Sequence, residues 1–197
     1  MAIGPFAWAR AARSAGVPFG PSRSAFEQAR INRAPSPVLA TALPWLTVVL
    51  GSLSPTWPVI ASAPVLPPLG FLALIAWQQL RPGLFPVWAG LPLGLVDDLY
   101  SGQPLGSAVL LWSLAIIGLD LAETRYPWRG FGQDWLVASA LTAVYLLAMA
   151  ALAAGGAGMP SPIILLPQLG LSVVIYPLGA RLISAFDRWR LVRFKVL

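Results

Sequence analysis

The sequence predicts an all-α membrane protein, a polytopic helical bundle with about six transmembrane helices and both chain ends in the cytoplasm. Three observations predict this class: the composition, the lengths of the apolar stretches and the placement of the basic residues. Of the 197 residues, 57% are hydrophobic and only 10% are charged, whereas soluble domains carry about 25% charged residues. Because so few polar side chains could not cover a water-soluble fold of this length, the composition favours lipid as the surrounding solvent.

Apolar stretches of nearly membrane-spanning length follow one another from residue 38 onward. A transmembrane helix needs about 20 residues, with a range of roughly 17–25. The predicted spans are residues 38–58, 64–80, 84–101, 104–121, 134–155 and 162–185. The second and third spans are short and contain prolines, so the sequence defines their ends least well. Together the six spans predict a membrane domain over residues 38–185.

The basic residues determine the predicted orientation. With six spans and a cytoplasmic N-terminus, all thirteen Lys and Arg residues fall in or beside cytoplasmic segments. The three outward connections, near residues 59–63, 102–103 and 156–161, contain none. Cytoplasmic segments of membrane proteins carry an excess of Lys and Arg. This distribution also supports the number of spans, because removing one helix would move basic residues to the outer side.

The segments that flank the membrane domain are basic. Residues 1–37 contain five arginines and five prolines, which predicts a flexible cytoplasmic tail. Residues 186–197 continue the last helix as a basic amphipathic tail, suited to anionic lipid headgroups or an acidic partner. Anchoring at the lipid surface is favoured over a specific contact. The candidate cytoplasmic contact residues are Arg125, Arg129, Arg188, Arg190, Arg193 and Lys195.

The composition also excludes or disfavours several functions. The chain has no cysteine and no histidine, which excludes disulfides, thiol nucleophiles, imidazole catalysis and zinc sites built from those residues. The net charge of +6 would favour nucleic acid only if the basic residues gathered on one water-exposed face. Because they lie between apolar stretches instead, we expect no nucleic-acid binding, and we expect no metal and no cofactor.

The most informative segment joins the end of the third span to the start of the fourth. Gly90, Gly94 and Asp98 are spaced four residues apart, so they share one face of a helix. Small residues at this spacing allow a neighbouring helix to approach closely. Asp98 is therefore predicted to point into the bundle. Asp97 lies about 100° around the helix and has no such shelter.

Two interpretations of Asp98 are open at this point. In the functional one it is a conformational or coupling residue, because acids within a membrane are commonly functional. In the structural one it ties the third helix to the following turn, and its position near the outer interface favours this interpretation. The turn contains Gly102, Pro104 and Gly106, of which Pro104 suits the first turn of the next helix. Paired carboxylates can also hold a metal or do acid–base work, but no other outer residue would complete such a site, so catalysis is not expected.

A second group of charged residues lies at the inner end of the fourth span. Asp120 and Glu123 are one turn apart and close to Arg125 and Arg129. A solvated cluster of ion pairs is favoured over a loop that docks a partner.

The segment from Gly94 onward resembles the rod shape-determining protein MreD family. That family shows a glycine, a hydrophobic run, an aspartate, a Ser-Gly pair and a Leu-Gly pair at this spacing. The matching positions are Gly94, Asp98, Ser101, Gly102, Leu105 and Gly106. The resemblance covers the membrane region from about residue 39 but not the first 37 residues, and the N-terminal extension and the doubled aspartate depart from the family pattern.

The resemblance implies a function in the bacterial inner membrane. The protein would be a non-catalytic, multi-pass subunit of the cell-elongation machinery that helps to scaffold MreC, MreB and the peptidoglycan synthases. Its partners would be these proteins and membrane lipids, and a small-molecule ligand is not expected.

The alternative follows from a similarity in fold between that family and the substrate-binding subunits of energy-coupling-factor vitamin transporters. A transporter subunit should gather polar groups near the midplane. The candidates are sparse and easily satisfied by the helix backbone or by neighbours: Thr47, Ser113, Ser139, Thr142, Tyr145 and Gln168. A membrane enzyme is the least favoured class.

Overall fold

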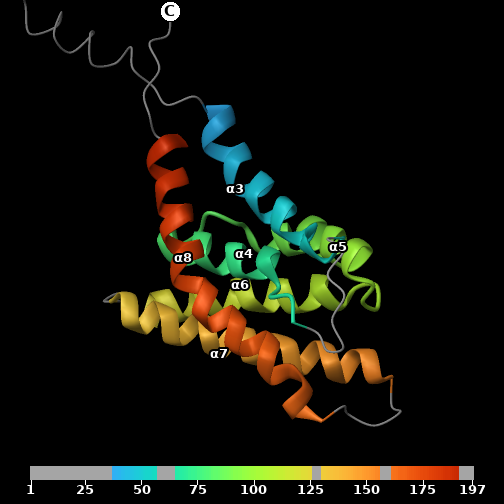
Figure 1. The fold of residues 1–197 in the computed structure, drawn as a ribbon. Coiled ribbons are helices and arrows are strands. Elements are labelled where there is room, and N and C mark those ends of the chain that lie inside the picture. The colour runs from blue at the N-terminus through green and yellow to red at the C-terminus, as the bar shows by residue number, and fades with distance from the viewer. Residues whose placement is uncertain (1–36, 57–64, 126–129, 156–160, 191–197) are drawn as a thin grey trace, which may run out of the picture. The chain divides into compact units, whose positions relative to one another are not determined.

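The regular structure of the protein is helical wherever the computed structural model describes it, namely in residues 37–56, 65–125, 130–155 and 161–190. These residues contain six α-helices, three short 3-10 helices and no β-strand (Figure 1). The elements are α3 (Pro37–Ser52), η1 (Ser54–Thr56), α4 (Leu69–Leu80), η2 (Val87–Ala89), α5 (Gly90–Ser101), α6 (Ser107–Arg125), α7 (Phe131–Ala154), η3 (Pro162–Leu165) and α8 (Leu166–Arg190). The predicted all-α class is confirmed. The tail predicted for residues 1–37 lies almost wholly outside the described residues.

Three helices within the described ranges are long and apolar enough to cross a membrane. They are α6 with 19 residues, α7 with 24 residues, and the 27-residue stretch Ile163–Trp189 that contains most of α8. Large apolar side chains such as Leu114 on α6, Val144 on α7 and Val174 on α8 are exposed on the outside of these helices. Exposed apolar surface of this extent is expected where lipid, and not water, surrounds a protein.

The helices α4 and α5 are shorter than the predicted second and third spans. Each has 12 residues, which corresponds to about 18 Å of helix. Proline explains the late start of α4, because Leu69 follows Pro67 and Pro68 and a residue before proline avoids helical backbone angles. Pro86 has an extended backbone and is followed by η2, so α5 begins only at Gly90.

The other helix ends also differ from the prediction by a few residues. The helix α6 begins at Ser107 and not at Pro104, and α7 begins at Phe131 and not at residue 134. The helix α8 continues to Arg190, so the predicted boundary at residue 185 falls inside it. The last residues of the predicted amphipathic tail, 191–197, lie outside the described residues.

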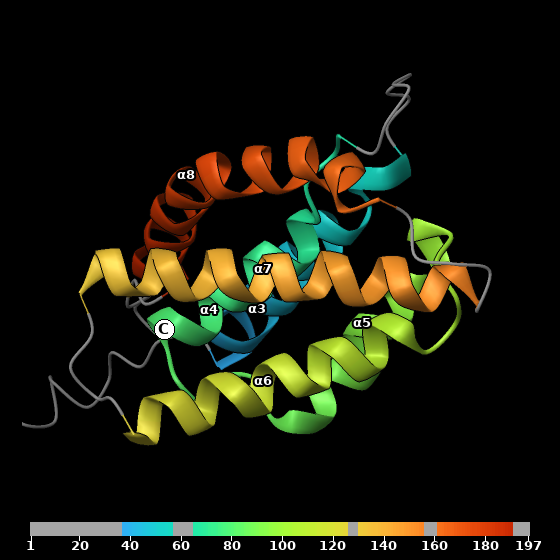
Figure 2. The same ribbon diagram turned by 90° about the horizontal axis from the view of Figure 1, so that it is seen from below.

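The helix α4 is the centre of the packed core. It contacts α3, α6, α7 and α8, and these helices surround it in both views (Figures 1 and 2). Eight of its twelve residues are buried, with Phe71, Leu74, Ile75 and Trp77 among the most enclosed side chains. A helix that is apolar on every side is expected in the interior of a bundle, which places α4 there.

Candidate functional site

The glycines of the motif allow α5 and α6 to approach each other closely. A Cβ atom on Gly94 would lie 2.6 Å from the backbone nitrogen and Cα of Val109, and one on Gly90 would lie 2.8 Å from the backbone nitrogen of Ser113. A Cβ atom does not approach backbone atoms this closely in proteins, so only glycine permits the observed separation of α5 and α6. The predicted close approach of a neighbouring helix is confirmed, and the neighbour is α6.

Asp98 caps the beginning of α6. Its side chain is 2% exposed. Its Oδ2 accepts a hydrogen bond from the backbone N–H of Gly106 (2.7 Å), and its Oδ1 accepts from the N–H of Ala108 (2.9 Å) and the hydroxyl of Ser107 (3.0 Å). The first N–H groups of a helix have no partner within the helix and form the positive end of its dipole. The carboxylate therefore ties α5 to the next turn and helix, as the structural interpretation of Asp98 predicts.

The turn between the two helices depends on its glycines. Gly102 and Gly106 have φ angles of 69° and 93°, in the region that residues with a Cβ rarely adopt. Pro104 precedes the helix, where its carbonyl accepts from the backbone N–H of Ser107 at 3.0 Å, so the prediction of Pro104 in the first helical turn is wrong. Leu105 projects outward and is 73% exposed.

Asp97 is buried, contrary to the prediction from the helical pattern. Its side chain is 7% exposed, and its Oδ2 accepts a hydrogen bond from the hydroxyl of Tyr145 on α7 at 3.2 Å. The small-residue pattern marked only the face of α5 that packs on α6. It could not show that α3 contacts α5 as well, nor that Tyr145 reaches α5 from 48 residues away.

A cavity of about 360 Å³ lies beside Asp97. Its polar side chains include Asp97, Ser101, Tyr145 and Gln168, and its apolar wall includes Leu146, Met149 and Leu165. Gln168 also donates to the backbone carbonyl of Leu66 at 2.6 Å. The hydroxyl oxygen of Ser101 is buried and has no hydrogen-bond partner among the residues that the structure describes. The cavity therefore gathers polar groups from three helices.

The other four polar side chains that the sequence offered as ligand-binding candidates are satisfied by the helix backbone or by neighbours, as predicted. The hydroxyls of Ser113, Ser139 and Thr142 each donate to the backbone carbonyl four residues earlier, at 2.7 Å. Thr47 donates to the carbonyl of Pro44 at 2.9 Å and accepts from the indole of Trp77 at 2.8 Å. Of the six candidates, only Tyr145 and Gln168 reach the cavity.

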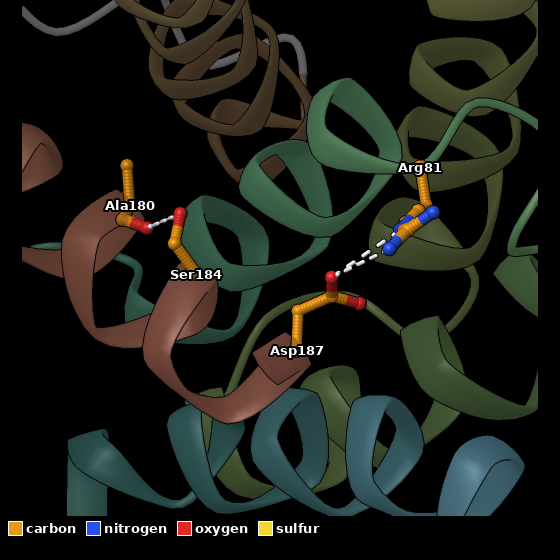
Figure 3. Close-up of polar contacts among 4 residues, drawn as sticks. All are labelled: Arg81, Ala180, Ser184 and Asp187. Atoms are coloured by element: carbon orange, nitrogen blue, oxygen red, sulfur yellow. Dashed lines mark hydrogen bonds and ion pairs between the residues drawn. The ribbon is translucent and has the colours of Figure 1, made fainter. Parts of the chain in front are cut away.

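The end of the bundle where α4 and α8 finish contains an ion pair that the sequence pattern did not predict. Arg81, which follows α4, donates to the carboxylate of Asp187 on α8 from Nη2 at 2.9 Å and from Nε at 3.3 Å (Figure 3). The hydrogen bonds and the negative charge of Asp187 raise the pKa of Arg81, so it stays charged. One turn earlier on α8, Ser184 donates to the carbonyl of Ala180. The signal in the sequence that could have indicated this pair is Asp187, an acidic residue within the otherwise basic C-terminal stretch.

Asp120 also differs from the prediction. It is half-buried, and its Oδ1 accepts from the side-chain amide of Gln78 on α4 at 2.6 Å. The oxygen of the same amide accepts from the backbone N–H of Phe85 at 3.2 Å. Asp120 therefore joins α6 to α4, a contact that the interpretation as a solvated cluster did not include, and Arg129 of that predicted cluster lies outside the described residues.

The predicted cytoplasmic contact residues are only partly described. Arg125 at the end of α6 and Arg188 on α8 are exposed. Arg129, Arg193, Lys195 and the side chain of Arg190 lie outside the described residues. Within the described ranges, no group of three or more Asp, Glu, His or Cys residues is placed to hold a metal.

Comparisons of the chain with models of known protein families, with curated proteins and with solved structures found no match.

Proposed function

We propose that the protein is a non-catalytic inner-membrane subunit of the bacterial cell-elongation machinery that helps to scaffold MreC, MreB and the peptidoglycan synthases. The proposal rests on the resemblance carried by Gly94, Asp98, Ser101, Gly102, Leu105 and Gly106. The observation that supports it is the structural use of this motif: its glycines set the distance between α5 and α6, and its aspartate caps α6. A rigid helix pair suits a protein that holds others in position.

A groove on the surface offers a place for such a partner. It has a volume of about 420 Å³ and lies between α3 and α8, with α4 at its base. Its lining is largely apolar, and Gly179 and Ala180 of α8 leave room for a close approach. Transmembrane helices associate through packing at small residues of this kind. In this proposal the groove receives a transmembrane helix of an MreC-like protein.

The proposal is tested by depletion and co-purification. Depletion should produce rounded or swollen cells, and the protein should co-purify with an MreC-like partner from gently solubilised membranes. Normal cell shape together with the absence of such a partner would remove the proposal.

A matched pair of variants tests the groove separately. Gly179→Leu should fill it and reduce the recovery of the partner by about tenfold or more, which corresponds to about 1.4 kcal/mol. Gly170→Leu is the control, because Gly170 lies on the same helix outside the groove. At both positions the first carbon of a new side chain would have no neighbouring atom within 4 Å. Equal recovery with both variants would exclude the groove as the contact while leaving the scaffold role testable by depletion.

The topology belongs to the same proposal. We place all six helices α3 to α8 in the membrane, with both chain ends in the cytoplasm, on the basis of the one-sided distribution of Lys and Arg. A reporter fused to the C-terminus that is active only in the cytoplasm should give a signal, and one active only in the periplasm should not. The reverse result would overturn the topology and the scaffold role with it.

The second candidate function is the substrate-binding subunit of a small vitamin-type transporter of the energy-coupling-factor kind. The observation that favours it is the cavity, where Tyr145 and Gln168 lie together with Asp97. If calorimetry on the purified protein revealed a vitamin that binds with nanomolar affinity, this result would favour the transporter subunit over the scaffold.

A further inference from the structure

The cavity beside Asp97 lies at one end of the helical bundle. Its lining comes from the last residues of α5 and α7, from η1 after α3, from the segment before α4 and from the start of α8. In the predicted topology every one of these helix ends is the outer end. The volume of about 360 Å³ falls within the range of about 300–1,000 Å³ that is usual for small-molecule sites. The cavity therefore has the size and position of a site for a ligand from the outer side.

The charge of the cavity limits which ligands it can take. Asp97 is acidic and more than nine-tenths buried, and none of the described residues that line the cavity is basic. A carboxylate can accept about four hydrogen bonds, and the Tyr145 hydroxyl donates one of them. A buried carboxylate is stabilised when a positively charged donor pairs with it. The charge of Asp97 therefore disfavours an anionic ligand and favours a cationic one.

The arrangement of Tyr145 fits the same ligand. Its ring stacks on Phe71 with 4.1 Å between the ring centroids and 17° between the planes, which fixes the tyrosine beside Asp97. Ser101 adds a buried hydroxyl that still lacks a partner among the described residues, and Leu146 and Met149 provide apolar surface for the rest of the ligand.

We infer that this cavity is a binding site for a small organic cation, in which a protonated amine pairs with Asp97 while an apolar body lies against Leu146 and Met149. The geometry that carries this inference is the buried carboxylate at the wall of a cavity of ligand size. The inference does not depend on the scaffold role, because a scaffold subunit and a transporter subunit could each carry such a site.

The experiment measures binding of two amine probes to the full-length protein in lipid nanodiscs at pH 7. The probes are 2-phenylethylamine and tryptamine, each compared with the neutral alcohol of the same skeleton, and binding is followed by calorimetry and by the shift in unfolding temperature. At least one amine should bind saturably, and its alcohol should bind about tenfold or more weakly, since a hydrogen bond to a charged group is lost.

Variants of the protein separate the site from partition into lipid. Asp97→Asn should weaken amine binding by about tenfold or more while it retains an oxygen that can accept from Tyr145. Glu123→Gln also removes one negative charge, outside the cavity lining, and should bind like the wild type. Ala150→Phe should reduce binding by filling the cavity, without changing the carboxylate.

Three results would overturn the inference. They are the absence of saturable binding by both amines, equal binding of amine and alcohol, and equal binding by the wild type and Asp97→Asn. None of these results bears on cell shape or on the recovery of a partner, so the scaffold proposal is judged by its own experiments.

Discussion

Replacement of Asp98 by alanine should destabilise the protein more than the same change at Asp97. The side chain of Asp98 accepts hydrogen bonds from the backbone N–H groups of Gly106 and Ala108. It also lies 3.0 Å from the hydroxyl of Ser107, whose single proton is shared with the carbonyl of Pro104. Each hydrogen bond to a charged group contributes about 1.5–3 kcal/mol, but such contributions are not additive within one network. We expect the free energy of unfolding to fall by about 3 kcal/mol, because the backbone N–H groups of Gly106 and Ala108 lose their acceptor at the start of α6.

The same change at Asp97 should lower the free energy of unfolding by less than the change at Asp98. The carboxylate of Asp97 accepts a hydrogen bond from Tyr145 at 3.2 Å and interacts with the hydroxyl of Ser52. Its removal also relieves the cost of a buried charge. We expect Asp97→Ala to lower the free energy of unfolding by about 1 kcal/mol. In cells, Asp98→Ala should accordingly impair assembly and shape more than Asp97→Ala.

The measurement is reversible unfolding of the purified protein in mixed micelles with increasing fractions of a denaturing detergent, followed by tryptophan fluorescence. Asp98→Asn provides a second test, because an amide keeps one acceptor oxygen but presents N–H donors to the N–H of Gly106 or Ala108. This variant should lie close to Asp98→Ala. Equal unfolding free energies for Asp97→Ala and Asp98→Ala, or full stability of Asp98→Asn, would refute the capping role.

Two further predictions concern packing and charge. Gly94→Ala should lower the free energy of unfolding by about 1–3 kcal/mol because its Cβ would overlap Val109, whereas Gly118→Ala on α6, with no neighbour within 4 Å, should be neutral or stabilising in the same assay. Arg81→Ala should lower the free energy of unfolding by about 1 kcal/mol, because half of the arginine side chain is exposed and water weakens its pair with Asp187. The difference in unfolding free energy from the wild type should shrink at high salt. A difference that salt does not change would contradict a mainly electrostatic contribution.

The features that sequence could predict are those that repeat over short distances. The spacing of Gly90, Gly94 and Asp98 describes one helix face, so it predicted both the close contact with α6 and the inward direction of Asp98. The glycines at 102 and 106 predicted a turn, because glycine adopts backbone conformations that other residues avoid. Backbone chemistry acts locally, and a single sequence displays it directly.

The features that were missed depend on residues far apart in the chain. Asp97 is sheltered by Tyr145 from 48 positions away, and Arg81 pairs with Asp187 from 106 positions away. Periodicity reports which face of a helix is apolar or small, but it does not report which other helix lies there. The cavity shares this limit, because its polar groups come from three helices whose neighbours only the folded bundle defines.

The enclosed position of α4 has a consequence for the synthesis of the protein. Polar groups on and beside this helix find partners on α8, which follows α4 by about a hundred residues. Gln79 accepts from Tyr176, the carbonyl of Leu66 accepts from Gln168, and Arg81 donates to Asp187. Until α8 has been synthesised, these groups on and beside α4 lack their partners. Chains that stop before residue 166 lack all three partners and should therefore be recognised as misfolded and degraded.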